Sequence, residues 1–131
     1  MFIDASALTA ILTNEPDAAA LLARLQTASL RLTSPLAIWE TMVAVSRILD
    51  LQPRVANEAI ETFLKMAEIE VVPVSAKTGR LAVEAYDRYG RSRHQAALNF
   101  GDCFAYACAR LAKVPLLYKG NDFPLTDIEA A

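Results

Sequence analysis

The chain has 131 residues, 54% of them hydrophobic, and a formal net charge of −2 at pH 7. Its length suits a single domain, residues 1–131, with a core of its own, and its composition excludes a disordered chain. A charge this small excludes a protein that attracts nucleic acid over its whole surface, and a single histidine excludes most catalytic zinc centres.

Short apolar segments alternate with helical ones along the chain. We expect strands at 2–3, 30–33, 69–74 and 114–118. Helices are expected at 5–12, 17–28, 35–50, 54–67, 75–89 and 102–113, with Pro16 and Pro35 in first turns and Gly90 at a helix end. Strands that alternate with helices predict an α/β fold with a short, mainly parallel sheet.

The sequence also bears on where the protein works. No apolar run reaches the roughly 20 residues that a membrane span needs. The N-terminus lacks the basic segment that opens a signal peptide. We therefore expect a cytoplasmic protein that has no membrane partner.

The segment 35–50 is apolar over more than half of its helical circumference. Ile38, Met42 and Val45 form one stripe, and Leu36 and Trp39 widen it. A helix of this kind is either buried or forms a contact between subunits. The segment 54–67 repeats the pattern, so we predict a homodimer or a contact with a partner protein here, with burial inside the domain as the alternative.

Four acidic residues stand where a sheet of this type would bring them together. Asp4 and Asp122 follow strands, while Glu40 and Asp102 lie near the starts of helices. Ligands of open parallel sheets bind beyond the carboxyl ends of the strands. We therefore expect the four carboxylates to converge at one edge of the sheet.

Each of these acids also has an ordinary structural explanation. Asp4 and Asp102 suit helix caps or first turns, Glu40 suits a solvated helix face, and Asp122 suits a turn. Jointly, however, gathered carboxylates repel one another unless a cation neutralises them. A hard divalent ion such as Mg²⁺ does so and promotes phosphodiester hydrolysis.

Hydroxyl and basic side chains are candidates for supporting roles. Ser6 and Thr126 could orient a ligand carboxylate, whereas Asp127 is expected to cap or pair locally. Basic residues gather between positions 77 and 94, where they either contact phosphates that flank the acidic site or form a solvated surface; they are Lys77, Arg80, Arg88, Arg91, Arg93 and His94.

Three sequence blocks resemble the PIN-domain proteins, and more narrowly the VapC toxins of bacterial VapBC toxin–antitoxin systems. The blocks are FIDASA at 2–7, LNFGDCFAYA at 98–107 and GNDFPLTDI at 120–128, with Glu40 on a helix between the first two. The last two blocks are quite specific, and the resemblance covers the whole chain. It implies a PIN-like three-layer α/β/α fold with a short, mainly parallel sheet.

The resemblance also implies a function and a set of site residues. Asp4, Glu40, Asp102 and Asp122 would bind Mg²⁺ or Mn²⁺, with Ser6 as the accompanying hydroxyl. The activity would be metal-dependent endoribonucleolytic cleavage of RNA. The partners would be a VapB-type antitoxin and a second copy of the chain, and operator DNA would be bound only through the antitoxin.

One position departs from the family pattern. Many relatives carry a second acid where this chain has Asn121, which leaves a direct and a water-mediated role open for Asp122. Two other functions compete with the ribonuclease toxin. One is a metal-dependent, structure-specific DNA nuclease; the other is a non-catalytic PIN-like binding module, which would be expected to lack some of the acids.

Overall fold

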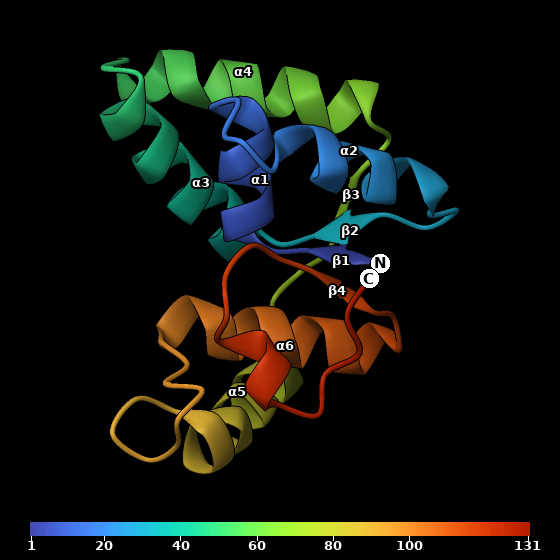
Figure 1. Cartoon of the computed structure of the whole chain (residues 1–131), viewed down its shortest axis with the longest axis vertical. Helices are drawn as coiled ribbons and strands as arrows, with labels where there is room; N and C mark the ends of the chain where they lie inside the picture. Colours follow the sequence, from blue (N-terminus) through green and yellow to red (C-terminus); the bar gives the residue numbers. More distant parts are fainter.

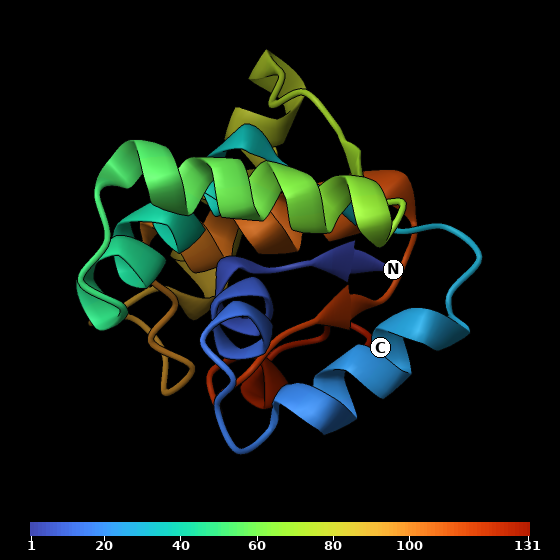
Figure 2. The same cartoon turned by 90° about the horizontal axis from the view of Figure 1, so that it is seen from above.

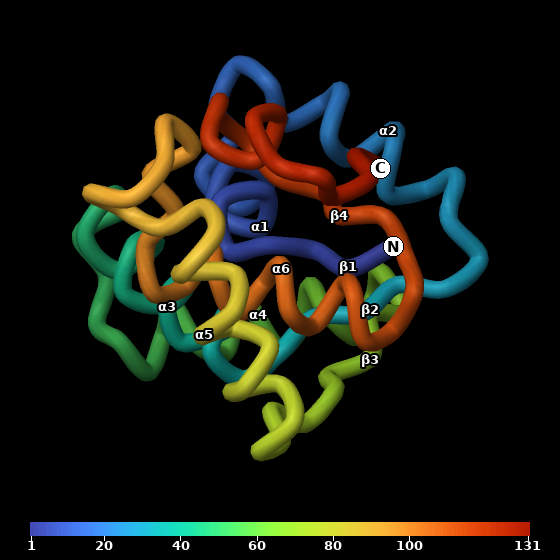
Figure 3. The backbone as a smooth tube through the Cα atoms, turned by 90° about the horizontal axis from the view of Figure 1, so that it is seen from below, coloured from blue at the N-terminus to red at the C-terminus, as the bar shows by residue number.

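The computed structural model describes residues 1–131 and contains six α-helices, one 3₁₀ helix and four short strands. Their bounds are β1 Phe2–Ile3, α1 Ala5–Leu12, α2 Ala18–Thr27, β2 Leu32–Thr33, α3 Pro35–Ile48, α4 Pro53–Met66, β3 Glu70–Val71, α5 Ala76–Tyr89, α6 Phe100–Ala112, β4 Leu116–Leu117 and η1 Phe123–Leu125. The strands lie in the order β3-β2-β1-β4, and every pair is parallel. Figure 3 shows this order directly. The expected α/β fold is confirmed.

The sheet separates two layers of helices. Helices α1 to α4 cover one face, and α5 and α6 cover the other (Figure 1). Successive side chains of a strand point to opposite faces. Accordingly, Phe2 and Leu116 belong to the core beneath α5 and α6, while Ile3 and Leu117 belong to the core beneath α1, α2 and α4. The two residues of β1 and the two residues of β4 therefore contribute to both cores of the α/β/α fold.

Three of the four strands are shorter than the sequence predicts, and prolines, which lack a donor, adjoin two of them. The expected strand 69–74 retains only Glu70 and Val71, and the last ladder bond runs from the Val72 amide to the Thr33 carbonyl (2.9 Å). Pro73 follows, and Pro115 precedes β4 in the same way. The helix expected at 102–113 begins two residues earlier, at Phe100.

The two chain ends meet beside the sheet (Figure 2). The amide of Leu116 donates to the Glu129 carbonyl (2.8 Å), and the amide of Ala131 donates to the Leu116 carbonyl (3.0 Å). The C-terminal segment thus covers the outer edge of β4, which would otherwise be an unpaired strand edge. None of the helices combines the length and apolar character that crossing a membrane requires.

Helix α3 is not buried all round. Ala37, Thr41 and Val45 face the interior, whereas Trp39 is 61% exposed and Ile48 is 55% exposed. Complete burial of this helix inside the domain, the alternative weighed from the sequence, is therefore wrong. Helix α4 instead has one buried face, formed by Ala56, Ile60 and Leu64.

Candidate active site

Asp4 lies at the carboxyl end of the central strand β1 and caps helix α1. Its Oδ2 atom accepts hydrogen bonds from the Ser6 amide (3.0 Å) and the Ser6 hydroxyl (2.5 Å). The residue is only 4% exposed. Burial raises its pKa, and the bonds from Ser6 oppose that rise. The capping role expected of Asp4 is therefore real, and it places a buried carboxylate at the edge of the sheet.

Ser6 joins this carboxylate to the end of another strand. Its Oγ atom donates to Asp4 and accepts a hydrogen bond from the Lys119 amide (3.0 Å), two residues after β4. The Asp4 amide also donates to the Leu117 carbonyl (2.9 Å). One hydroxyl thus fixes the carboxylate relative to the chain that follows β4.

Asp102 is the third residue of α6 and forms a capping box with Asn99. The Asp102 amide donates to Asn99 Oδ1 (2.9 Å), and the Asn99 amide donates to Asp102 Oδ2 (2.8 Å). This box explains why α6 begins at Phe100. Burial, followed by the charges of Asp4 and Asp122, raises the pKa of Asp102 to about 6.

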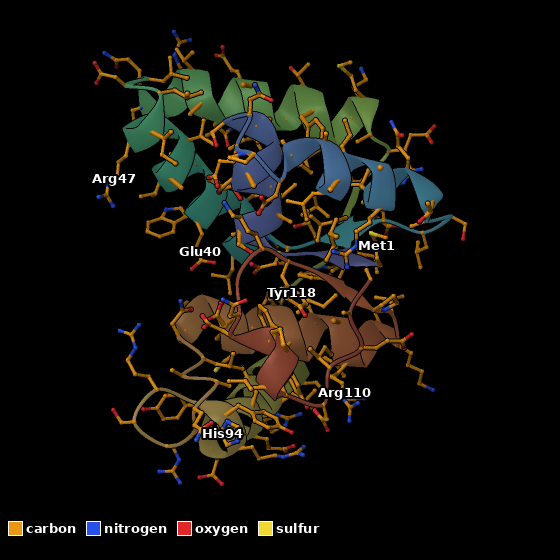
Figure 4. The ribbon with its side chains drawn as sticks, in the orientation of Figure 1. Met1, Glu40, Arg47, His94, Arg110 and Tyr118 are labelled. Atoms are coloured by element: carbon orange, nitrogen blue, oxygen red, sulfur yellow. The ribbon has the colours of Figure 1, made fainter.

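Glu40 projects from α3 toward α6, at the level where the two helical layers meet (Figure 4). Its carboxylate lies so close to Gly101 that a Cβ atom there would overlap its oxygens. Burial, followed by the charges of Asp4 and Asp102, raises the pKa of Glu40 to about 7.

Gly101 is therefore a site residue that sequence reasoning missed. A glycine inside a helix destabilises it by roughly 0.5–1 kcal/mol relative to alanine, and it is retained where a close approach requires it. The signal was present, because Gly101 stands directly before Asp102 in an otherwise strong helix.

These side chains share one open pocket of about 440 Å³. Its polar lining includes Asp4, Ser6, Glu40, Asp102, Glu15 and Lys119. The structure therefore brings three of the four predicted acids together. Glu15 and Lys119 were not among the predicted site residues, although both line the same pocket.

Asp122 lies outside this lining. It occupies the position before η1 and makes no capping bond with its side chain, yet its charge still raises the pKa of Asp102. Thr126 uses its hydroxyl locally, donating to the Phe123 carbonyl (2.7 Å) and accepting from the Ile128 amide (3.2 Å). The structure thus gives Thr126 a role in the turn and shows no bond from it to a site carboxylate.

Comparisons with known proteins agree over the whole chain. The profile of the PIN domain family matches residues 1–129. The chain is 41% identical over 130 residues to "Ribonuclease VapC" of Mycolicibacterium smegmatis, covering 99% of this chain and 98% of that one. It is 42% identical over 133 residues to "Ribonuclease VapC28" of Mycobacterium tuberculosis, covering 100% and 97%. The chain belongs to the PIN-domain family of VapC ribonucleases.

A solved structure agrees with the fold. The crystal structure of Mycobacterium tuberculosis VapC20, described as a sarcin-ricin loop cleaving toxin, superposes with a TM-score of 0.76. The alignment covers 99% of this chain and 97% of VapC20 at 18% sequence identity. At this low identity the comparison bears on the fold alone. The superposition confirms the three-layer PIN architecture.

VapC ribonucleases are generally metal-dependent, and the donor set of this pocket fits a hard cation. Asp4, Glu40 and Asp102 offer only oxygen atoms; burial raises the pKa of all three, and neighbouring carboxylates raise it further for Glu40 and Asp102. No three acidic, histidine or cysteine side chains are already arranged as a coordination shell. The pocket therefore offers negative charge to a divalent ion, but its side chains are not already arranged around one ion position.

The basic residues between 77 and 94 divide into several environments. Arg93 pairs with Asp87 (2.5 Å), and Arg88 pairs with Asp127 (3.3 Å). His94 packs edge-on against Tyr89, far below Glu40 in Figure 4. Among these residues, Arg91 acts on the site through its charge, which opposes the rise in the pKa of Asp102. Phosphate contacts by this cluster stay a prediction.

Proposed function

We propose that this protein is a metal-dependent endoribonuclease that acts as the toxin of a type II toxin–antitoxin pair and is inhibited by a VapB-type antitoxin. The observation that carries the proposal is the shared pocket of Asp4, Glu40 and Asp102 in a chain of the VapC family. A toxin of this kind works on RNA in the cytoplasm. Binding of operator DNA is assigned to the antitoxin, consistent with the toxin's net charge of −2.

The acidic residues of the site would serve as metal ligands. Asp4, Asp102 and Glu40 would hold Mg²⁺, with Mn²⁺ as an alternative, and Asp122 would act directly or through a water. Such an ion lowers the pKa of a bound water and neutralises charge on the phosphoryl group.

The chain's own contribution is to orient the carboxylates. Asp4 and Asp102 each engage Oδ2 in a helix cap, which leaves Oδ1 free of those bonds and available to an ion. Ser6 fixes the rotation of the Asp4 carboxylate, and Gly101 lets Glu40 approach α6. Side-chain orientation of this kind positions a ligand without touching the substrate.

The decisive experiment compares RNA cleavage by the parent, Asp4→Asn and Asp50→Asn in Mg²⁺ and in EDTA. Asp50 is exposed and stands outside the pocket, so its variant carries the same charge change elsewhere. We expect Asp4→Asn to lose at least about a hundredfold in rate, since it removes a charged ligand. We expect Asp50→Asn to match the parent and EDTA to abolish activity.

The same assay separates the rival functions. Cleavage of a DNA hairpin or flap in preference to RNA would replace the ribonuclease by a DNA nuclease. If the parent protein binds its antitoxin but cleaves neither RNA nor DNA in Mg²⁺ or in Mn²⁺, only the non-catalytic binding module remains.

A homodimer is the second part of the proposal. Apolar side chains remain uncovered on α3, as described, and on the other layer, where Val83 is 70% and Phe100 is 67% exposed. Residues of α5 and α6 also line an apolar groove of about 350 Å³. Exposed apolar surface of this extent is typical of an interaction site. Sedimentation at tens of micromolar is expected to give a dimer, and a monomer there would contradict this part.

A further inference from the structure

One cation stands among the acids of the pocket. Lys119 is the only basic residue in its lining, which also contains Asp4, Glu15, Glu40 and Asp102. A phosphodiester chain that enters this pocket meets strong repulsion from the carboxylates. A divalent ion would offset this at the scissile phosphate, but the neighbouring phosphates need a different positive partner.

Lys119 is held at both ends, so its ammonium group has a defined place. Its backbone amide donates to Ser6 Oγ (3.0 Å), next to Asp4. Its Nζ atom donates to Glu15 and lies 3.7 Å from Asp17, both in the segment between α1 and α2. The Lys119 side chain is 34% exposed. The ammonium is therefore fixed at the rim of the pocket and still reachable from solvent.

The ammonium also has capacity for a further partner. A lysine ammonium has three N–H donors, and only the bond to Glu15 has hydrogen-bond length, because 3.7 Å to Asp17 is too long. Partly exposed ion pairs of this kind contribute only about 0–1 kcal/mol, so the pair can admit a phosphate oxygen.

We propose that Lys119 binds a non-bridging oxygen of an RNA phosphate adjacent to the scissile one, and that Glu15 is a positioning residue that presents the ammonium. The inference rests on the proposed ribonuclease function and deepens it, since it assigns a substrate-binding residue of the same pocket. The contact of Lys119 is with the sugar-phosphate backbone, so it should contribute equally to the binding of all RNA sequences.

The test measures cleavage and binding of a single-stranded RNA as a function of salt concentration for Lys119→Met and for Lys65→Met. Lys65 is an exposed residue of α4 outside the pocket, so both variants lose one positive charge. We expect KM to rise about tenfold or more in Lys119→Met, because a hydrogen bond to a charged group is lost. The slope of log affinity against log salt should fall by about 0.7 in this variant, which is one phosphate contact on a single strand. Lys65→Met should keep the parental KM and slope.

A merely structural role for Lys119 predicts a different result. In that case the melting temperature falls, Lys119→Arg fails to restore KM, and the salt slope remains parental, which would overturn the proposal. If Lys119→Met does not fold, Lys119→Arg and Glu15→Gln carry the test. Under the proposal, Lys119→Arg retains both the parental KM and the parental salt slope, and Glu15→Gln raises KM without lowering the melting temperature.

The role of Glu15 is tested by combining the substitutions. If Glu15 acts through Lys119, Glu15→Gln raises KM in the parent but has no further effect on the Lys119→Met protein. Equal effects in both backgrounds would remove Glu15 from the proposal. A parent that cleaves RNA while Lys119→Met keeps its KM and slope contradicts this inference alone, whereas a parent without RNA cleavage contradicts the proposed function.

Discussion

Asp102 and Asp127, both in the C-terminal third of the chain, have opposite surroundings. Asp127 accepts a hydrogen bond from the Tyr106 hydroxyl (2.6 Å) and faces Arg88 and Arg110, at 3.3 and 3.8 Å. The bond from Tyr106, with the two arginines, holds the pKa of Asp127 below its ordinary value. Asp102 has burial and two other acids around it, and its pKa rises to about 6.

The contrast distinguishes Asp127, whose charge the protein neutralises, from Asp102, whose charge is disfavoured by burial and neighbouring acids. The Asp127 charge is already neutralised by the protein, so it ties the C-terminal segment to α5 and α6. The burial and repulsion that act on Asp102 are only partly offset, by the hydrogen bond from the Asn99 amide and the charge of Arg91, so its ionised form is disfavoured. Strongly perturbed acids of this kind are characteristic of functional sites.

The largest expected effect is on the RNA cleavage rate when Asp102 or Asp127 is replaced by asparagine. Asp102→Asn should lower the RNA cleavage rate by at least about a hundredfold while leaving the fold intact. Asp127→Asn should keep the cleavage rate within a few-fold of the parent but lower the free energy of unfolding by about 1 kcal/mol. Initial rates and urea titrations measure both quantities, and equal rate losses in the two variants would erase the distinction.

The next effect concerns the contact that brings Glu40 to the site. Gly101→Ala places a methyl group against the Glu40 carboxylate and should reduce cleavage by about tenfold or more, since small misplacements of site groups are costly. Gly79→Ala is the matched control, because nothing lies within 4 Å of its added Cβ. That variant should retain activity and gain up to about 1 kcal/mol in stability. An active Gly101→Ala protein would show that the position of Glu40 is not critical.

A smaller effect is the pH dependence of stability without metal. The pKa values of Glu40 and Asp102 in the folded protein are raised to about 7 and about 6. At a pH above the ordinary pKa values of these side chains, the folded protein therefore binds more protons than the unfolded chain. Their contribution is therefore complete at low pH and is lost as the pH rises through 6 to 7. The melting temperature in EDTA should fall by roughly 5 °C over this range.

Addition of Mg²⁺ provides the control for this pH effect. An ion that binds the ionised carboxylates should raise the melting temperature at pH 7.5 and have little effect at pH 5. A melting temperature in EDTA that rises between pH 5 and 7 would contradict the assigned role of the two acids.

The smallest effect is the opposite pH dependence that Asp127 contributes. Its pKa is lowered in the folded protein, so its stabilisation is present above the unfolded value of 3.8 and is lost as the pH falls through the folded value. The difference in stability between the parent and Asp127→Asn should therefore shrink at acidic pH. Thermal unfolding between pH 2.5 and 6 (roughly) tests this, and a gap that widens on acidification would contradict it.

The sequence allowed the α/β fold and the meeting of Asp4, Glu40 and Asp102 to be predicted, because parallel strand ends share one edge. It did not reveal Gly101 as a site residue, since its requirement comes from how closely α3 approaches α6. The pairing of Lys119 with Glu15 was also missed, because it joins positions 104 apart in the chain. Thr126 was a candidate to orient a ligand carboxylate, whereas its hydrogen bonds in the structure close a local turn. Whether Asp4, Glu40, Asp102, Asp122 and Ser6 act in catalysis stays a prediction.

The contact between Glu40 and Gly101 has a mechanical consequence. Glu40 belongs to α3, which lies above the sheet in Figure 1, Asp102 belongs to α6, which lies below it, and Asp4 directly follows β1. The three carboxylates thus come from both helical layers and from the end of the strand between them. A displacement of α3 from α6 would therefore separate Glu40 from Asp102 without a contact to either side chain.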